Sequence, residues 1–479
     1  MKILYINLPY KFEISRTSRW PEKTKSGTLY YPFWLAYSAG YSQLKGHEVQ
    51  LIDCIASGNS RNSLFERVSE FSPDYIVTEI TTSTCVYDFE TIAEIKRQFP
   101  NPKIIVAGTH ATALPELVLK SCPSIDIVAR SEYELMVVEL ASGQPLTDIL
   151  GISYLKDGVF QSNSDRQYCD NLDEFPFVSK VYKQFLNFND YFYSFAQKPM
   201  IQIFSARGCP HHCNFCSYPE TMGGRAFRKR SVSNLVDELE YISRELPEIR
   251  EIFIEDDTFT VDQKRVAEIC DEIIRRNLKI LWSCNTRVDL SLPLMRKMKE
   301  AGCRLLVVGF ESGNQEVLDQ TRKGIKLTES LAFAENSKLA GLKVFGCFMI
   351  GLTGDTLETI EETFRFAKRC CPDMCFFQQA VPFPGTRFYQ WVKEKGYLIT
   401  EDYGQWLNDD GYLNCLVQYP WGGPKDVERL RDKLMSRYYF SFTYIIKTFL
   451  SNLSWQEFKR VTKGAWAYFS FRAKKILKK

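Results

Sequence analysis

Three cysteines in one short stretch are the residues of this chain best suited to metal chemistry. Cys209, Cys213 and Cys216 have the spacing C-x3-C-x2-C and directly follow the apolar run 200–204. Three thiolates can bind three irons of a cubane cluster and leave the fourth iron without a protein ligand. Such an open position is typical of a reactive metal site rather than a structural one. No further cysteine follows until Cys270, in a predicted helix, so the spacing predicts a 4Fe-4S cluster with one open iron.

Two other interpretations of these cysteines are open. A structural zinc site needs C-x2-C pairs or a quartet of cysteine and histidine ligands. His211 and His212 lie inside the loop, but no second pair completes the triplet. The three residues can also be unrelated buried cysteines. Their compact, asymmetric spacing favours the iron-sulfur cluster over both.

With Phe215 before the third cysteine, the motif resembles the C-x3-C-x-aromatic-C signature of the radical S-adenosylmethionine (SAM) enzymes. The resemblance implies that the amino and carboxylate groups of SAM occupy the open iron. One electron from the cluster would cleave SAM to a 5'-deoxyadenosyl radical, which removes hydrogen from an unactivated carbon. It also implies a reducing partner such as flavodoxin or ferredoxin.

Strand and helix patterns alternate from the cysteine motif onward, which predicts a partial (β/α)6 barrel over 196–395. The predicted strands are 200–204, 251–255, 279–284, 304–310, 343–350 and 374–380. The predicted helices lie near 233–245, 262–276, 293–301, 328–340 and 357–369. In such a barrel the active site lies at the carboxyl ends of the strands.

The predicted strand ends carry glycine and polar residues. Residues 309–313 resemble the family's G-x-E-S-G loop, which contacts the amino acid and ribose parts of SAM, and 384–386 resemble its P-G-T loop near adenine. A carboxylate suits an ammonium group or ribose hydroxyls, and an arginine suits a carboxylate. Together with Phe215, the candidate SAM-binding residues are Glu255, Arg287, Gly309, Glu311, Ser312, Gly351, Pro384, Gly385 and Thr386.

Structural roles are open for some of these residues. An ion pair between Glu311 and Arg287 across the strand ends is the alternative to SAM binding. Asp256 and Asp257, beside Glu255, can bind the substrate or cap the following helix.

The first 145 residues alternate in the same way and predict an α/β, doubly wound, Rossmann-like domain. The predicted strands are 2–8, 48–54, 75–81, 103–108 and 126–129, with helices near 33–45, 63–71, 87–99, 115–120 and 132–141. Such sheets bind ligands beyond the carboxyl ends of their strands. Glycine and hydroxyl residues at 81–84 and 106–112 follow two of these strands.

An α/β domain placed before a radical SAM core resembles the cobalamin-binding radical SAM family. That family includes methylases of unactivated carbons, hopanoid-modifying enzymes and the anaerobic magnesium-protoporphyrin cyclase. Residues 108–112 resemble its G-G-P-H-x-T loop and 130–134 its R-G-E-x-E loop, although Ala107, Thr109 and Ser131 depart from the pattern. The resemblance implies cobalamin contacts from Thr82, Ser83, Gly108, Thr109, His110, Ser131 and Glu132.

The family's D-x-H-x-x-G motif, whose histidine is the lower cobalt ligand, is absent. The chain has four histidines, His47, His110, His211 and His212, and none lies in that pattern. We therefore expect bound cobalamin to have no histidine as its lower ligand.

Composition limits the other function classes. The net charge of +3 gives no general basis for nucleic acid binding. Fifteen cysteines without a secretory signal indicate a reducing, cytoplasmic location, and no apolar stretch is long enough to span a membrane.

Two further regions complete the predicted organisation. Residues 146–195 read as a hairpin at 152–160 followed by an aromatic linker, and 396–479 as a lid and a small helical C-terminal region. The basic, aromatic end 469–479 can contact an anionic membrane surface peripherally, or it can be a core-packing helix with a solvated lysine tail.

The combined reading is a radical SAM enzyme that uses cobalamin to methylate an unactivated carbon of a lipid or secondary metabolite. One SAM would supply the radical and another would remethylate cobalamin. Radical cyclisation, hydroxylation or rearrangement without methyl transfer is the alternative within enzymes, and a peptide or antibiotic precursor stays open as substrate. A non-catalytic cobalamin or redox sensor is the alternative of another class.

Overall fold

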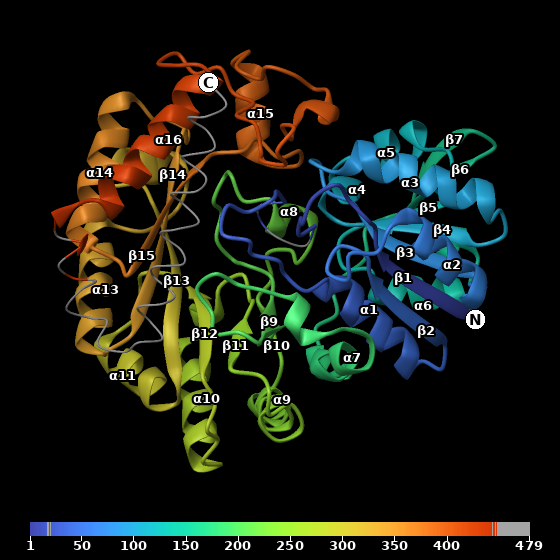
Figure 1. The fold of residues 1–479 in the computed structure, drawn as a ribbon, viewed down its shortest axis with the longest axis horizontal. Coiled ribbons are helices and arrows are strands. Elements are labelled where there is room, and N and C mark those ends of the chain that lie inside the picture. Colours follow the sequence, from blue (N-terminus) through green and yellow to red (C-terminus); the bar gives the residue numbers. More distant parts are fainter. Residues whose placement is uncertain (17–18, 20, 443, 446, 448–479) are drawn as a thin grey trace.

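The computed structural model describes residues 1–447 apart from 17, 18, 20, 443 and 446. Two sheets organise the molecule, one in the N-terminal half and one in the half that follows the linker (Figure 1). The short helix α8 (Tyr218–Thr221) and the N-terminal loop lie between them. The predicted α/β class is confirmed.

The first sheet has the order β2-β1-β3-β4-β5-β6-β7. Five of its strands are parallel and match the predicted ones: β1 (Lys2–Asn7), β2 (Glu48–Asp53), β3 (Tyr75–Glu79), β4 (Lys103–Ala107) and β5 (Ile127–Ala129). The hairpin β6 (Ile152–Lys156) and β7 (Val159–Ser162) adds to this sheet, because β6 pairs antiparallel with β5. We expected the hairpin in the connector. It instead extends the first sheet beyond residue 145.

Helices cover both faces of the first sheet, as expected for a doubly wound fold. Side chains alternate along each strand, so Ile3 and Tyr5 pack in one core cluster and Leu4 and Ile6 in another. The first cluster includes α1 (Phe33–Leu44) and α6 (Glu134–Ala141). The second includes α2 (Arg61–Phe71), α3 (Cys85–Gln98) and α5 (Pro115–Ser121). The five-residue helix α4 (Thr109–Ala113) begins directly after β4.

The second sheet is parallel and follows chain order from β8 to β15, as the predicted partial barrel requires. Its strands are β8 (Met200–Ile203), β11 (Glu251–Ile254), β12 (Trp282–Thr286), β13 (Cys303–Glu311), β14 (Lys343–Ile350) and β15 (Met374–Gln379). The intervening helices are α9 (Val232–Glu245), α10 (Gln263–Arg275), α11 (Leu292–Glu300), α12 (Gln315–Gln320), α13 (Leu327–Leu339) and α14 (Leu357–Cys370). They lie along the outer side of the curved sheet (Figure 1).

Short elements were not apparent from periodicity. Two two-residue strands, β9 (Ala206–Arg207) and β10 (Arg228–Lys229), pair antiparallel around the cysteine loop. Single-turn helices occur at η1 (Leu146–Asp148), η2 (Leu172–Glu174), η3 (Phe188–Asp190), η4 (Phe259–Val261) and η5 (Tyr403–Gln405).

The linker between the sheets is packed rather than loose. It contains α7 (Val178–Phe185), and its aromatic residues Tyr191, Tyr193 and Phe195 are buried. The Tyr191 hydroxyl donates a hydrogen bond to Asp53 at 3.0 Å, which ties the linker to the end of β2. The packing expected from its aromatic content is confirmed.

The C-terminal region contacts both halves of the molecule. It contains α15 (Arg387–Glu394) and α16 (Pro424–Tyr439). Its loop pairs with the N-terminal loop, because the Leu413 amide donates to Glu22 at 2.9 Å and the Lys23 amide donates to the Gly411 carbonyl at 2.9 Å. The predicted basic end 469–479 lies outside the described residues. Among the helices that are described, none has the length and apolarity to cross a membrane.

Candidate functional site

The cysteine loop leaves β9 through a turn that requires glycine. Gly208 has φ +84°, and a Cβ there would lie 2.1 Å from the Ala226 carbonyl oxygen. The next amide, of Cys209, donates to the Gly224 carbonyl at 3.1 Å. A side chain at 208 would push the Ala226 backbone away from the start of the cysteine loop. The glycine therefore fixes where the first cysteine lies.

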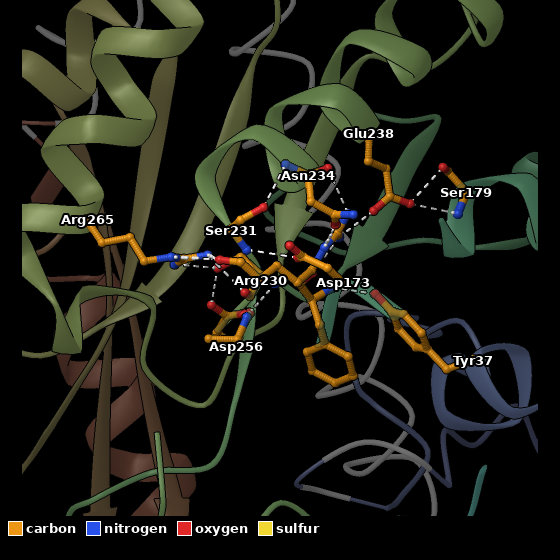
Figure 2. Close-up of polar contacts among 12 residues, drawn as sticks. Tyr37, Asp173, Ser179, Arg230, Ser231, Asn234, Glu238, Asp256 and Arg265 are labelled. Carbon is orange, nitrogen blue, oxygen red and sulfur yellow. Dashed lines mark hydrogen bonds and ion pairs between the residues drawn. The ribbon is translucent and has the colours of Figure 1, made fainter. Parts of the chain in front are cut away.

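Buried charges hold the start of the loop. Asp256 accepts hydrogen bonds from the amides of Ser205 at 2.6 Å and Ala206 at 2.9 Å, and Arg265 donates to the Ser205 carbonyl at 2.9 Å. Figure 2 shows Asp256 and Arg265 meeting at this point. Both roles considered for Asp256 from sequence are therefore wrong: it holds the loop, and Asp262 caps α10.

The three cysteines differ from the others in exposure. Cys209, Cys213 and Cys216 are partly exposed, whereas every other cysteine except Cys169 is buried. The pKa of Cys216 is raised to about 12, mainly by burial; the positive charge of Arg19 opposes this rise, and the neighbouring thiols Cys213 and Cys209 contribute to it. The thiols thus lie within electrostatic reach of one another. A bound cation would ionise them, because metal ligation requires thiolates.

The arrangement fits a cubane better than a single ion. Within the described part of the chain, no three or more histidine, cysteine, aspartate or glutamate side chains are arranged to hold one metal ion. A closed zinc site would gather its ligands around one point. A cubane instead takes each thiolate on a different iron.

The strand-end loops meet at Asn214, between the second and third cysteines. Its amide donates to the Thr321 carbonyl at 3.0 Å, its side chain donates to Thr353 at 3.2 Å, and its carbonyl accepts from the Phe388 amide at 2.9 Å. These partners follow β13, β14 and β15. The predicted SAM loops therefore lie beside the cysteine loop.

Glu311 is paired with a lysine that the sequence did not single out. It has φ +62°, and β13 shifts register between Gly309 and Glu311. Its Oε1 accepts a hydrogen bond from Lys323 Nζ at 2.8 Å, and both side chains are 9% exposed. The alternative ion pair with Arg287 is wrong, because Arg287 donates to the carbonyls of Lys323 and Gly324.

Two predicted SAM residues use their hydroxyls within the protein. Ser312 lies 3.1 Å from the Thr363 hydroxyl on α14, and Thr386 accepts from the Tyr389 amide at 3.1 Å as the N-cap of α15. Both side chains are buried. Their hydroxyls therefore hold the loops in place, and SAM contact from these two residues stays a prediction.

Other predicted residues line the same strand ends. Phe215 is partly exposed, Pro384 is buried and Gly385 is exposed. The carbonyl of Gly351 accepts a hydrogen bond from the Tyr419 hydroxyl at 2.7 Å, so the C-terminal region reaches this loop.

Glu255 directly follows β11 and bonds to a residue of the neighbouring strand β8. It accepts a hydrogen bond from Gln202 at 2.8 Å, and burial raises its pKa to about 8. The positive charge of Arg19 acts in the opposite direction. Glu255 can therefore hold a proton near neutral pH in the cofactor-free protein.

Arg19 reaches the cysteine loop from the N-terminal half. Its guanidinium pairs with Asp257 at 2.5 Å and lies 3.9 Å from Cys216 Sγ. Sequence reasoning missed it. The long segment 8–32 between β1 and α1 was the available signal, because loops of that length in compact domains are usually functional.

Gly108 begins the predicted cobalamin loop in a conformation that favours glycine. Its φ is +101°, and a Cβ would lie 2.6 Å from the Ile80 carbonyl oxygen. The loop thus runs against the end of β3. Glycine is therefore required at 108 so that the loop can pack against the segment after β3. The loop lies beyond the carboxyl ends of the strands, where such sheets bind their ligands.

His110 follows in α4 and is almost completely buried. Its Nδ1 lies 3.1 Å from the Thr82 hydroxyl, and Nε2 has no hydrogen-bond partner among the described residues. Burial lowers the pKa of His110 to about 3, so the ring is neutral. An unpaired buried nitrogen fits a bound partner that the protein alone does not supply.

The remaining predicted cobalamin residues are already engaged. Ser83 donates to the Pro21 carbonyl at 2.5 Å, and Thr109 is the first residue of α4. The Ser131 amide donates to the Thr112 hydroxyl at 2.8 Å. Glu132 accepts two hydrogen bonds from Arg228, at 2.6 and 2.9 Å, so its carboxylate is engaged in an ion pair.

The two candidate sites adjoin. A Cβ built on Gly385 would lie 3.4 Å from Ala113 of α4 and 3.3 Å from Thr221 of α8. The loop after β15, the helix after the third cysteine and the predicted cobalamin helix therefore meet. Tyr403 of the C-terminal region closes the same side, with its ring 4.8 Å from the His110 ring.

Known families match both halves of the chain. The radical SAM superfamily matches residues 203–367, and the B12 binding domain matches residues 23–141. The chain is 33% identical over 416 residues to an uncharacterised methyltransferase of Pyrococcus horikoshii, covering 86% of this chain and 87% of that protein.

The chain belongs to the cobalamin-binding radical SAM family. Another relative is the anaerobic magnesium-protoporphyrin IX monomethyl ester cyclase of Rubrivivax gelatinosus, 29% identical over 382 residues, covering 76% of this chain and 66% of that one. The solved structure of the cobalamin-dependent SAM radical enzyme OxsB superposes with a TM-score of 0.71 at 17% identity, covering 98% of this chain and 72% of that chain. This likeness confirms the predicted fold.

Membership establishes the general activity. The protein is a cobalamin-dependent radical SAM enzyme, and its cofactors are a 4Fe-4S cluster, SAM and cobalamin. It needs a reductant and acts on a small-molecule substrate.

Proposed function

We propose that the enzyme methylates an unactivated carbon of a lipid or secondary metabolite. The observation that carries the proposal is the contact between α4, α8 and the loop at Gly385, which brings the two candidate cofactor loops together. A substrate radical generated at one site can react with a methyl donor at the other only if the two sites adjoin. The methyltransferase of Pyrococcus horikoshii supports the same outcome.

The roles of individual residues follow from their contacts. Cys209, Cys213 and Cys216 hold the cluster, which supplies the electron for SAM cleavage, while cobalamin supplies the methyl group. Glu311 and Lys323 form a buried pair that presents an acceptor and a cation together. In our proposal the carboxylate binds the ammonium or ribose hydroxyls of SAM and the ammonium of Lys323 binds its carboxylate.

Cobalamin is proposed to bind without a histidine as lower ligand. The loop that begins at Gly108 would contact the cofactor, and His110 would donate or accept one hydrogen bond at its edge. Because the His110 Nδ1 is engaged with Thr82, we assign the residue to the periphery of the cofactor. A flavodoxin or ferredoxin as reductant and a cytoplasmic location complete the proposal.

The test uses SAM with a deuterated methyl group. Reduced, cofactor-loaded enzyme is incubated with extracts of candidate acceptors, and products are analysed by mass spectrometry. We expect S-adenosylhomocysteine and 5'-deoxyadenosine in comparable amounts and deuterium in a carbon-bound methyl group. Formation of 5'-deoxyadenosine and product without S-adenosylhomocysteine would reject methylation.

Radical chemistry without methyl transfer is the second candidate, because the cyclase of Rubrivivax gelatinosus is also similar. Cyclisation, hydroxylation and rearrangement share the SAM cleavage step and predict a product without deuterium, which differs from the substrate in mass or, for a rearrangement, in structure alone. Membership in a family of enzymes does not support the sensor alternative. A sensor would leave SAM intact even when the cluster is reduced.

A further inference from the structure

Four buried charges connect the first domain to the cysteine loop. Arg228 donates two hydrogen bonds to Glu132, at 2.9 and 2.6 Å, and Arg207 lies 3.4 Å from Glu132 and 2.8 Å from Glu134. The four side chains are between 0% and 6% exposed. The glutamates follow β5 in the first domain, and the arginines pair across β9 and β10 beside the cysteines.

Burial of these charges needs an explanation other than stability. Removing two ions from water costs several kcal/mol per ion, roughly as much as their attraction returns. Apolar side chains of similar volume would therefore hold the domains together as well. Arg207 is also enclosed by Trp34, Tyr37 and Phe175, with its guanidinium carbon 4.6 to 4.9 Å from the ring centres. Its geometry is therefore fixed by charges on one side and rings on the other.

The arginines determine where the first cysteine lies. Arg228 also donates a hydrogen bond to the Gly223 carbonyl at 2.7 Å. The adjacent Gly224 carbonyl accepts a hydrogen bond from the Cys209 amide at 3.1 Å. Arg207 is two residues before Cys209 on the paired strand. A movement of the arginine pair therefore moves the backbone of Cys209.

The glutamates are linked to the predicted cobalamin loop. Ser131, directly before Glu132, has φ +61° and donates its amide hydrogen to the Thr112 hydroxyl at 2.8 Å. The Thr112 amide in turn donates to the Gly108 carbonyl at 3.0 Å. Gly108 and Cys209 are therefore connected by an unbroken series of hydrogen bonds and covalent bonds, which passes through Glu132 and Arg228.

We propose that Glu132 is a positioning residue that couples the two cofactor sites, so that forming the cluster at Cys209 strengthens cobalamin binding at Gly108. The inference rests on the proposed placement of cobalamin at that loop. By linkage, bound cobalamin stabilises the cluster to the same extent. The carboxylate acts through Arg228 and contacts neither cofactor.

The test is a titration with hydroxocobalamin, followed by its visible spectrum, of full-length protein with and without a reconstituted cluster. We expect the cluster to lower the dissociation constant at least ~5-fold, the low end of measured couplings. In Glu132→Gln the two dissociation constants should agree within about 2-fold. The iron content and the spectrum of bound cobalamin should stay as in the unaltered protein.

A matched control is available in Arg230 and Glu238, a second buried ion pair at 2.5 Å. Figure 2 shows Glu238 between Arg230 and Ser179, and its hydrogen bonds go to these two residues. Glu238→Gln removes an equally buried carboxylate and should keep the cluster-dependent change. Glu132→Gln with an unaltered change, or an equal loss in both variants, would overturn the proposal.

A second variant is needed in case Glu132→Gln does not fold. The conservative substitution Glu132→Asp keeps a negative charge between Arg228 and Arg207 and should retain part of the coupling. If both variants lose the cluster outright, the ion pair is only structural and the proposal is rejected. An unaltered protein that binds no hydroxocobalamin would reject the proposed function as well, whereas binding without any effect of the cluster rejects the coupling alone.

Discussion

The strand ends of the two sheets present opposite kinds of surface to their cofactors. After β9, the thiols of Cys209, Cys213 and Cys216 are partly exposed and available as ligands. After β3 to β5, polar side chains are buried and paired with one another, as His110 with Thr82 and Glu132 with Arg228. One site binds through side-chain chemistry. The other offers the backbone of the loop that begins at Gly108 and a few remaining polar atoms, such as His110 Nε2.

The two sites should therefore differ in how well they tolerate amino-acid substitutions. Metal ligation depends on each thiolate, so the loss of one ligand removes the site. Binding through shape and backbone is distributed over many contacts, so single substitutions should weaken it by degrees. The following predictions test this contrast.

Replacement of one thiol should have the largest effect. Cys213→Ala removes an iron ligand, and we expect loss of the cluster and of all 5'-deoxyadenosine formation, measured by iron content and by chromatography after reduction. Cys169→Ala is the control, because Cys169 is also partly exposed but lies outside the motif. A Cys213→Ala protein that retains the cluster would contradict the contrast.

Substitution of Gly108 should lower the stability of the protein and weaken cobalamin binding without abolishing either. Gly108→Ala forces a side chain into φ +101° and against the Ile80 carbonyl. Gly143→Ala has a similar φ of +81° with nothing within 4 Å, and should cost only the backbone strain, roughly 1–2 kcal/mol. Gly108→Ala should cost about 1–3 kcal/mol more, measured by denaturant unfolding, and should retain less cobalamin on purification. Equal losses in the two variants would show that the Ile80 contact is unimportant.

The buried histidine should make stability depend on pH. The pKa of His110 is lowered from 6.5 to about 3 by burial. Between pH 6.5 and about 3, His110 binds a proton in the unfolded chain but stays neutral in the folded chain. The free energy of unfolding therefore decreases as the pH is lowered through this range, by at most about 1.4 kcal/mol per pH unit.

The measurement compares denaturant unfolding of cofactor-free protein at pH 7.5 and 5.5. In His110→Gln this part of the decrease should vanish. His47→Gln should change the slope less, because His47 is only partly buried. An unchanged slope in His110→Gln would mean that the histidine ring is solvated.

The smallest effect is expected at the contact between the C-terminal region and the cobalamin loop. Tyr403→Leu removes an edge-to-face ring contact with His110, worth about 0.5–1.5 kcal/mol. The free energy of unfolding of the cofactor-free protein, measured with denaturant, should therefore fall by about that amount. Tyr403→Phe keeps the ring and should be as stable as the unaltered protein, whereas equal destabilisation of both variants would assign the effect to the hydroxyl.

Local patterns explain why most of the fold could be predicted. Strands such as β1, β4 and β14 are rich in apolar residues, and helices such as α10 and α14 have an amphipathic period, so these elements are visible within their own residues. β9 and β10 have two residues each, which is too short for any period. The place of the hairpin β6 and β7 depends on pairing with β5, which the hairpin's own sequence does not indicate.

The same limit applies to the candidate site. The cysteine spacing is local and led directly to the cluster. Arg19 and Asp257 are 238 positions apart, and Glu132 and Arg228 are 96 apart. Each is a single charged residue outside any periodic pattern, and only the fold brings the partners together. The hydroxyls of Ser312 and Thr386 were assigned to SAM because the sequence does not show which way a side chain points.

The central claim is that one chain holds both cofactors at adjoining sites and uses them together. The most direct test is the cofactor content of protein produced with cobalamin and purified without oxygen, followed by reduction in the presence of SAM. We predict about four irons and about one cobalamin per chain, with a spectrum that lacks a nitrogen lower ligand, and formation of 5'-deoxyadenosine. An intact cluster that cleaves SAM in a chain that retains no cobalamin would contradict the account.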